Sequence, residues 1–180
     1  MAFLLGEHMN YIIISRDNID KEHICCAMSN KKSLVKKEWL KERFDEGLVF
    51  YRTEERGKCF IEYIPDKYAW IPITSNNYMY INCLWVSGSM KGHGYSNELL
   101  DYCIEDARQK GYNGVCILSS KGRKKEFLSD YKYLTHKEFK IADESDNGII
   151  LMYLPLSDDN PPKFKECAKH PLKNDTYYNA

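Results

Sequence analysis

The sequence predicts an α/β fold with one hydrophobic core, and three observations support this prediction. Apolar runs typical of strands alternate with segments of helical periodicity, in the order β-α-α-β-β-β-α-β-α-β-β. The length of 180 residues is ordinary for a single domain, and a hydrophobic content of 43% can supply a core. One apolar run, Tyr78–Val86, leads through a glycine-spaced loop into a helix.

The first part of the chain predicts a strand and two helices. Residues Asn10–Ser15 form a β-rich apolar run. Asp17–Asp20 offer a side-chain cap for a short helix that carries apolar residues as far as Ala27. Ser33 can cap a second helix, which Gly47 ends. The helically spaced apolar residues of the second helix are Val35, Trp39, Leu40 and Phe44.

The remaining elements follow from apolar runs and the turns between them. Leu48–Arg52 and Cys59–Ile64 predict a hairpin with a charged turn, and residues 65–77 an extra strand with loops. After the strand Tyr78–Val86, a helix carries Leu99, Leu100, Cys103, Ile104 and Ala107 on one face and ends at Gly111. The predicted later elements are a strand at 114–118, a helix at about 126–136, and a closing strand pair at 139–142 and 148–154.

The loop between the strand and the helix predicts an anion site. Gly92 and Gly94 allow a sharp turn that exposes main-chain N–H groups, and the following helix directs its positive end to the same place. The spacing excludes a P-loop, because three residues separate Gly88 from Gly92 and His93 replaces the lysine. It excludes the dinucleotide fingerprint, whose third glycine would be Asn97. From the loop alone, a helix-entry turn that binds nothing is an equal alternative.

Composition narrows the class of protein. With 26 basic and 26 acidic residues the net charge is zero, so no overall field favours binding to nucleic acid or to an anionic membrane. The start of the sequence lacks a basic leader and no apolar run is long enough to span a membrane, so we expect a cytoplasmic protein. Seven cysteines without a Cys-x-x-Cys pair predict reduced, buried thiols and no metal site.

The residues Ser89-Met90-Lys91-Gly92-His93-Gly94 carry a resemblance to a known family. Between a strand and a helix, they resemble the acetyl-coenzyme A motif Gln/Arg-x-x-Gly-x-Gly/Ala of the GNAT superfamily of N-acetyltransferases. Both glycines match, and Ser89 replaces the leading Gln/Arg. The order of elements extends the resemblance over about residues 10–155. The tail 161–171 is similar to that of a YoaP-like branch. The resemblance implies a mixed sheet of about seven strands, flanked by helices, with its central strands splayed apart.

The resemblance also implies the division of the chain into domains. Residues 1–156 would form the acetyl-coenzyme A-binding acetyltransferase domain. Residues 157–180 are polar, contain Pro161-Pro162 and lack apolar periodicity, so we expect an extension or linker. A second domain follows such a tail in YoaP-like relatives, and its loss from this chain is an open alternative.

In the superfamily, the acyl donor lies between the two splayed strands. The resemblance implies that main-chain groups near Leu84 pair with the pantetheine arm and polarise the thioester carbonyl. Amides of the glycine loop would hold the pyrophosphate, and Lys91 with the basic loop 121–125 would add positive charge. The coenzyme-binding residues implied in this way are Leu84, Trp85, Val86, Ser89, Met90, Lys91, Gly92, His93, Gly94, Tyr95 and Ser96.

The expected catalytic residues depart from the family pattern. The strand position that often carries a glutamate base is Asn82, which cannot accept a proton at neutral pH. In the ending Tyr-x-x-x-Gly-Phe, the tyrosine aligns with Leu134 and the glycine with Glu138. Tyr133 and Tyr131 are then the candidate acids that protonate the departing thiolate. Glu62, on the preceding hairpin, is the candidate base.

The resemblance implies direct acetyl transfer from acetyl-coenzyme A to a primary amine of a small molecule or peptide, by a monomer or homodimer. An aromatic cluster before the cofactor strand is a candidate wall for the acceptor, although ordinary packing explains most of it. The cluster consists of Tyr63, Tyr68, Trp70, Tyr78 and Tyr80. The substitutions at Asn82 and Leu134 keep a non-catalytic acyl-coenzyme A sensor open as an alternative. A nucleotide-binding protein that uses the same loop is a third alternative.

Overall fold

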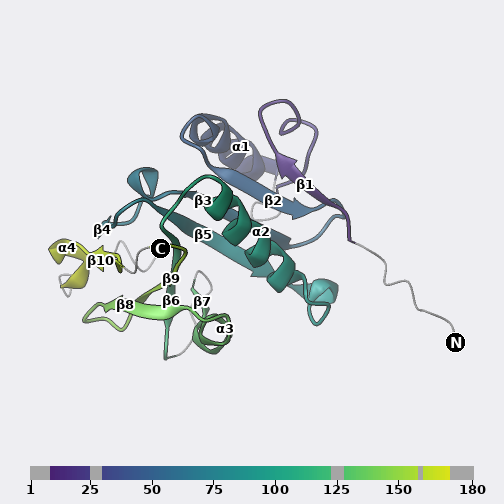
Figure 1. Ribbon diagram of the computed structural model, residues 1–180. Helices are drawn as coiled ribbons and strands as arrows, with labels where there is room; N and C mark the ends of the chain where they lie inside the picture. Colours follow the sequence, from purple (N-terminus) through teal and green to yellow (C-terminus); the bar gives the residue numbers. More distant parts are fainter. Residues whose placement is uncertain (1–8, 25–29, 123–127, 158–159, 171–180) are drawn as a thin grey trace, which may run out of the picture.

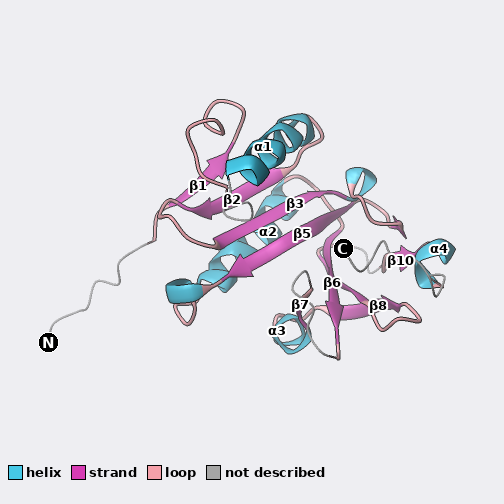
Figure 2. Cartoon of the chain, turned by 180° about the vertical axis from the view of Figure 1, so that it is seen from behind, coloured by secondary structure: helices cyan, strands magenta, loops and turns pink. Residues whose placement is uncertain are grey.

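The computed structural model describes residues 9–24, 30–122, 128–157 and 160–170. One twisted main sheet lies between helix α1 on one face and helix α2 on the other (Figures 1 and 2). Its strand order is β1-β2-β3-β5-β6-β9-β8, and β7 pairs with β6 outside this path. The pairs β5–β6 and β6–β7 are parallel and the others antiparallel, so the predicted mixed sheet of an α/β fold is confirmed.

The bounds of the elements agree with most of the predicted ranges. The strands of the main sheet are β1 (Tyr11–Ile14), β2 (Val49–Thr53), β3 (Cys59–Pro65), β5 (Tyr78–Val86), β6 (Gly114–Ser120), β7 (Ser129–Asp130), β8 (Lys140–Glu144) and β9 (Ile150–Pro155). A small second sheet pairs β4 (Ile73–Thr74) with β10 (Lys163–Phe164). The helices are α1 (Asn30–Phe44), α2 (Tyr95–Gln109), α3 (Tyr131–His136) and α4 (Glu166–Lys169), with 3-10 turns η1 (Asp66–Tyr68) and η2 (Gly88–Met90).

Two hydrophobic clusters fix the layers. On one face of the sheet, Leu40 of α1 packs with Phe50, Phe60 and strand residues that include Tyr78. On the other face, α2 contributes Leu99, Leu100, Cys103 and Ala107, the side chains that the sequence places on its apolar face. Burial of these side chains on both sides of one sheet holds the two helices in place.

The central strands β5 and β6 part from each other. They pair in parallel from Tyr78 opposite Gly114 to Ile81 opposite Ile117. Beyond that point β6 pairs with β7, while residues 83–86 of β5 pair with β3 on their other side. Figure 2 shows the two strands diverging. Among the described strands, none pairs with the edge of Leu84–Val86 that faces β6.

A β-bulge marks the point where the strands begin to part. In the pairing of β3 with β5, Glu62 lies opposite Cys83, whereas Tyr63 lies opposite Ile81. Asn82 is therefore the extra residue on β5. A bulge bends its strand and increases the local twist, which turns the last part of β5 away from β6.

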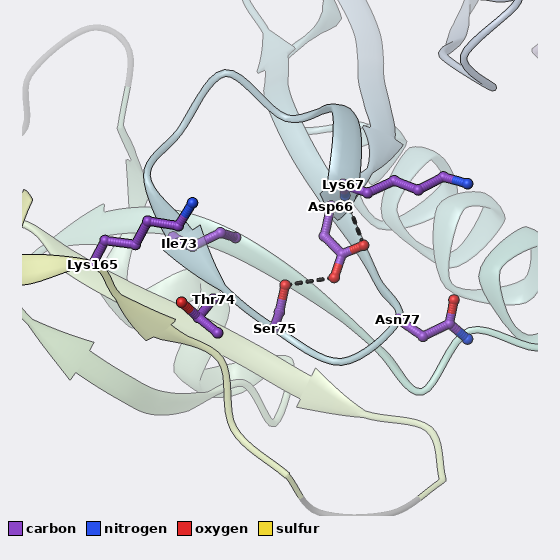
Figure 3. A pocket seen from close by; sticks show the side chains of 7 residues that line it. All are labelled: Asp66, Lys67, Ile73, Thr74, Ser75, Asn77 and Lys165. Atoms are coloured by element: carbon purple, nitrogen blue, oxygen red, sulfur yellow. Dashed lines mark hydrogen bonds between the residues drawn. The ribbon is translucent and has the colours of Figure 1, made fainter.

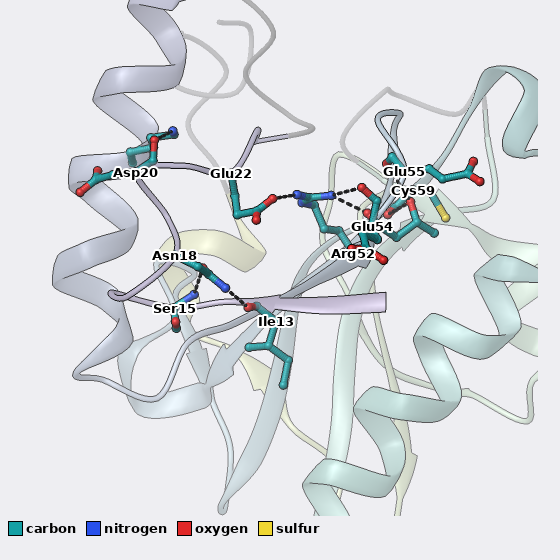
Figure 4. A network of polar contacts seen from close by, with 11 residues as sticks. Ile13, Ser15, Asn18, Asp20, Glu22, Arg52, Glu54, Glu55 and Cys59 are labelled. Atoms are coloured by element: carbon teal, nitrogen blue, oxygen red, sulfur yellow. Dashed lines mark hydrogen bonds and ion pairs between the residues drawn. The ribbon is translucent and has the colours of Figure 1, made fainter. Parts of the chain in front are cut away.

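The predicted first helix is wrong over its described part. Residues 16–21 form turns, and Ala27 lies outside the described residues. The side chain of Asn18 accepts a hydrogen bond from the Ser15 N–H and donates one to the Ile13 carbonyl (Figure 4). It thus fastens the end of β1 instead of capping a helix. Further along, Arg52 binds Glu22 and the carbonyl oxygens of the hairpin turn, so this loop is tied to β2.

Three further predicted features differ from the structure. Helix α1 begins at Asn30, ahead of the predicted cap Ser33, and Val35 is 68% exposed although its spacing suggests a core position. The helix predicted at 126–136 is shorter, because β7 precedes it and the Asp130 side chain caps α3 by accepting the Tyr133 N–H. Residues 126–127 lie outside the described part.

The segment after residue 156, expected to be an extension, packs on the domain. Strand β10 pairs with β4, and Phe164 and Ala168 are buried in the same hydrophobic cluster as Leu40. Asp143, near the end of β8, accepts the Phe164 N–H and forms an ion pair with Lys169 at 3.1 Å. Phe164 and Ala168 are spaced four residues apart within a polar sequence. Two apolar residues are too few to establish a periodicity, so the sequence does not predict that this segment packs on the domain.

Candidate active site

The glycine loop has the backbone that the sequence predicts. Gly92 and Gly94 have φ angles of 85° and 84°, a region that favours glycine. Gly94 is the residue before α2, and no side-chain hydrogen bond caps the helix there. The first N–H groups of an α-helix lack intrahelical acceptors, so this end of α2 offers donors and a positive partial charge to an anion.

A cavity of about 200 Å³ connects this loop to the parted strands. It brings together the loop and start of α2, the end of β5, and the start of α3. The lining residues are Leu84, Val86, Lys91, Gly92, Ser96, Ser129, Asp130 and Tyr133. Ser129 and Asp130 were not predicted as site residues, although a Ser-Asp pair before a helix is a capping signal that marks an exposed polar turn.

Other predicted coenzyme-binding residues take different positions. Met90 is buried under the loop and lies next to Gly57, while Ser89 is exposed. The N–H groups of Met90 and Lys91 donate to the carbonyls of Ser87 and Gly88 and so stabilise the turn η2. These two donors are therefore already used within the protein. Trp85 belongs to the α1 face of the sheet, with the Lys58 ammonium 5.5 Å from its ring centroid. The exposed ring of His93 stacks on Tyr95 at 5.4 Å.

The Tyr133 side chain spans two walls of the cavity. Its hydroxyl donates to the Ser96 carbonyl at 3.0 Å, which connects α3 to the first turn of α2. Burial raises the pKa of Tyr133, against a smaller lowering by its hydrogen bond to Ser96. The phenol is therefore protonated at neutral pH and able to act as an acid. Tyr131 is not among the residues that line the cavity, and its ring lies beside Lys121.

The positions that replace the family's terminal motif have structural roles. Leu134, in the place of the tyrosine, is fully buried in the core under α2. Glu138, in the place of the glycine, has a φ angle of 65° and closes α3 in a left-handed conformation. Phe139 follows and is buried. The backbone thus keeps the turn that explains a glycine in the motif, while the buried leucine cannot supply a hydroxyl.

Glu62 lies at the centre of a buried polar cluster on the α1 face. It is 3% exposed, and both of its carboxylate oxygens have partners. Oε1 accepts a hydrogen bond from the Asn82 side-chain amide at 3.0 Å, and Oε2 lies 2.7 Å from Lys36 Nζ of α1. The cluster is adjacent to the slot because Asn82 is the bulge residue where the strands part. A carboxylate thus lies one strand away from the position where family members often carry it.

The aromatic residues proposed as an acceptor wall do not form one surface. Tyr63 is buried under α2, where its hydroxyl donates to Asp106 at 2.9 Å. Tyr78 and Tyr80 are buried in the core on the α1 face. Trp70 is 75% exposed and contacts Trp39 edge-on, with a centroid distance of 5.8 Å. Ordinary packing accounts for the buried three, because successive residues of a strand point to opposite faces.

The described cysteines are thiols, with Cys59, Cys103 and Cys116 buried, Cys83 partly buried and Cys167 exposed. Burial raises the pKa of the Cys116 thiol, which keeps it protonated at neutral pH. Cys25 and Cys26 lie outside the described residues. In the part of the chain that the structure describes, no group of three or more His, Cys, Asp and Glu side chains could hold a metal ion.

A second cavity of about 410 Å³ lies at the opposite end of β5 (Figure 3). Asp66 lines this cavity and accepts hydrogen bonds from the Ser75 hydroxyl at 2.5 Å and the Tyr78 N–H at 3.0 Å. The other lining residues are Lys67, Ile73, Thr74, Asn77 and Lys165. The Asp66 carboxylate is occupied in fixing the start of β5, so this cavity has a structural explanation.

Comparison with known proteins identifies the family. The model of the Acetyltransferase (GNAT) family matches residues 18–123. A Bacillus subtilis (strain 168) protein named Uncharacterized N-acetyltransferase YoaP is 46% identical over 183 residues, an alignment that covers 96% of this chain and 72% of that protein. The chain belongs to the GNAT acetyltransferase family. The resemblance to its YoaP-like branch is confirmed by the same match, and membership makes the protein an acyltransferase.

Solved structures of GNAT proteins share the fold at low sequence identity. A GNAT family acetyltransferase from Brucella melitensis in complex with acetyl-CoA matches with a TM-score of 0.56 and 15% identity, over 88% of this chain and 94% of that chain. The GNAT family protein YhbS from Escherichia coli in complex with CoA matches with a TM-score of 0.57 and 10% identity, over 88% and 91%. Within the described residues, no helix of this GNAT protein is long and apolar enough to cross a membrane.

Proposed function

We propose that this GNAT protein transfers an acetyl group from acetyl-CoA to a primary amine by direct attack in a ternary complex. Acetyl-CoA is the cosubstrate of the family, and acetyl-CoA or CoA is bound in both solved structures described above. The observation that carries the proposal is the slot between β5 and β6. It opens after Ile81 and Ile117 and leads to the cavity at the glycine loop.

The binding of acetyl-CoA is proposed to follow from the main chain. N–H groups at the start of α2 and in the loop around Gly92 would hold the pyrophosphate, and Lys91 at the cavity would add positive charge. The edge of Leu84–Val86 that faces away from β3 would pair with the amides of the pantetheine arm, as a neighbouring strand would. A main-chain N–H near Leu84 would then stabilise negative charge on the thioester oxygen.

Two side chains are proposed to move protons. Glu62 would accept a proton from the acceptor amine, because its carboxylate is bound to Asn82, the bulge residue at which the central strands begin to part. Tyr133 would donate its phenol proton to the departing thiolate, because it lines the cavity and burial keeps it protonated. Tyr131 is a weaker candidate for this acid, since it does not line the cavity. The acceptor amine belongs to a small molecule or a peptide.

A non-catalytic acyl-CoA sensor is the second candidate. The observation in its favour is that Leu134 is buried where the family motif carries a tyrosine, so the usual acid is absent from that position. The two functions differ in turnover. Release of the CoA thiol is measured after the chain is mixed with acetyl-CoA and a panel of primary amines that includes lysine peptides. Release that depends on the amine supports the transferase, whereas tight binding of acetyl-CoA without release on every amine supports the sensor.

A further inference from the structure

The ion pair between Lys36 and Glu62 places a primary amine on the candidate catalytic base. Lys36 Nζ lies 2.7 Å from Glu62 Oε2 and 3.9 Å from the ring centroid of Trp39. The exposed fractions of the Lys36 and Glu62 side chains are 23% and 4%. A carboxylate on one side and an aromatic face on the other are the two groups that proteins use to hold an ammonium ion. Lys36 thus places a primary amine against the proposed base, as an acceptor amine would be placed.

The slot for the acyl donor lies along the far edge of β5, one strand away from Glu62. Glu62 lies opposite Cys83 across the pair β3–β5, and the next residue, Leu84, lines the cavity. Lys36 reaches Glu62 from the α1 face of the sheet, whereas α2 and its glycine loop lie on the other face. The amine and the phosphate-binding loop thus approach the parted strands from opposite faces. A coenzyme bound as proposed would keep its phosphates on the α2 face, on the other side of the sheet from the Lys36 amine.

We propose that Lys36 is a site of self-acetylation, an inference that rests on the binding of acetyl-CoA in the slot. Glu62 accepts a proton from the Lys36 ammonium, and the neutral Nζ attacks the thioester carbonyl carbon. A C–N bond forms and the C–S bond breaks. The sulfur leaves with the electron pair of the C–S bond and is protonated to the CoA thiol, with Tyr133 as its proton donor. The nitrogen loses its second proton, so the products are acetylated Lys36, CoA and one net proton released to water.

The same helix contains a matched control. Lys41 is also an ion-paired lysine of α1, with its Nζ 2.9 Å from Asp20 and 3.0 Å from Glu38. Both of these carboxylates are exposed, at 71% and 72%, and neither belongs to the polar cluster beside the slot. Non-enzymatic acetylation by acetyl-CoA would modify lysines by exposure and would not prefer Lys36 to Lys41. Faster acetylation of Lys36 than of Lys41 would therefore indicate that the acyl donor is bound close to Lys36.

The experiment uses the full chain of 180 residues and acetyl-CoA with a deuterated acetyl group. Peptide mass spectrometry follows the label at Lys36 and Lys41 over time and at several protein concentrations. We expect label at Lys36 at least tenfold faster than at Lys41, with a rate constant independent of protein concentration, because the reaction is intramolecular. Glu62→Gln should slow the labelling of Lys36 about 100-fold, the range of general-base effects. Lys36→Arg should keep the fold and remove the main labelled site.

Acetyl-CoA binding is measured in parallel by calorimetry, so that two failures can be told apart. If the chain binds acetyl-CoA and acetylates an added amine while Lys36 stays unlabelled, self-acetylation is refuted and the proposed transferase stands. Equal labelling of Lys36 and Lys41 would refute it as well. If the chain does not bind acetyl-CoA, the proposed function and the self-acetylation are both refuted.

Thermal unfolding of each variant shows whether a loss of labelling reflects a loss of fold. The Lys36 to Lys41 comparison within the unmodified sequence decides the case even where Glu62→Gln does not fold.

Discussion

The side-chain amide of Asn82 donates a hydrogen bond to Glu62 Oε1 at 3.0 Å, across the bulge where the central strands begin to part. The residue that replaces the family's usual glutamate thus orients a carboxylate on the neighbouring strand. We interpret the pair as a relocated base, in which Asn82 fixes one oxygen of Glu62 and leaves the other to interact with an amine.

Replacement of Glu62 by glutamine tests this interpretation. Glu62→Gln should lower kcat about 100-fold and leave the Kd of acetyl-CoA unchanged, because a general base acts only in the chemical step. Release of the CoA thiol gives kcat and calorimetry gives Kd. Glu54→Gln, at an exposed carboxylate in the hairpin turn, is the control and should change neither. An unchanged kcat in Glu62→Gln would remove it as the base.

Two substitutions of Gly92 distinguish the effect of backbone strain on stability from the effect of a negative charge on acetyl-CoA binding. Gly92 has a φ angle of 85° and open space at its missing Cβ, so Gly92→Ala should cost about 1 kcal/mol of stability through strain alone. Gly92→Glu adds a carboxylate at the proposed pyrophosphate site and should weaken acetyl-CoA binding more than 100-fold, about 2.7 kcal/mol. Chemical denaturation gives the first quantity and calorimetry the second. Equal affinities of the alanine and glutamate variants would exclude the loop from coenzyme binding.

Tyr133 should determine the alkaline limit of turnover. Tyr133→Phe should lower kcat more than it weakens acetyl-CoA binding, whereas Tyr131→Phe, outside the cavity, should retain both. An acid acts while it is protonated, and its contribution is lost as pH rises through its pKa. Because burial raises the pKa of Tyr133, turnover should continue to a pH above the ordinary tyrosine range. A pH profile that falls in the same range for Tyr133→Phe and the unmodified chain would contradict this role.

Glu138 is in a conformation that a glycine would adopt at no steric cost. With a φ angle of 65°, Glu138→Gly should raise the free energy of unfolding by about 1 kcal/mol. Glu138→Ala removes the same side chain without relieving the strain and should bring no such gain. Urea denaturation measures both. A stabilisation by alanine that equals the one by glycine would show that the side chain, and not the backbone, is the cause.

The packed tail gives a test of the domain boundary. Phe164→Ala should lower the free energy of unfolding by about 3 kcal/mol, as expected for a buried phenylalanine. Lys163→Ala, at an exposed position on the same short strand, should change it by less than about 0.5 kcal/mol. If both variants unfold like the unmodified chain, residues 163–169 act as the linker that the sequence suggests.

Most strands could be predicted from the sequence, because apolar runs bounded by turn residues carry that information locally. The strand 78–86 and the hairpin 139–154 are examples. The helix expected after Asp17 was wrong, because the Asn18 side chain bonds back to β1 and local capping patterns do not reveal a tertiary partner. The β4–β10 pair joins segments about 90 residues apart in sequence, a separation at which local periodicity carries no signal.

The candidate site was predictable in its main-chain part. Glycines at 92 and 94 require backbone freedom that the sequence displays directly. The Lys36–Glu62–Asn82 cluster joins a helix and two strands, and its formation depends on the bulge, which no single segment encodes. The roles of Glu62, Tyr133 and Tyr131, the domain boundary at residue 156, the oligomeric state and the cytoplasmic location stay predictions.

The parting of β5 and β6 has a consequence for evolution within such a family. In the binding mode proposed above, the acyl donor is held by main-chain groups, which every residue except proline supplies in full, so most mutations along the strands would leave cosubstrate recognition intact. Side chains on the α1 face of the sheet would then be free to vary in sequence. A lineage that binds its donor in this way would be able to exchange one amine acceptor for another without changing the half of the enzyme that holds the acetyl group.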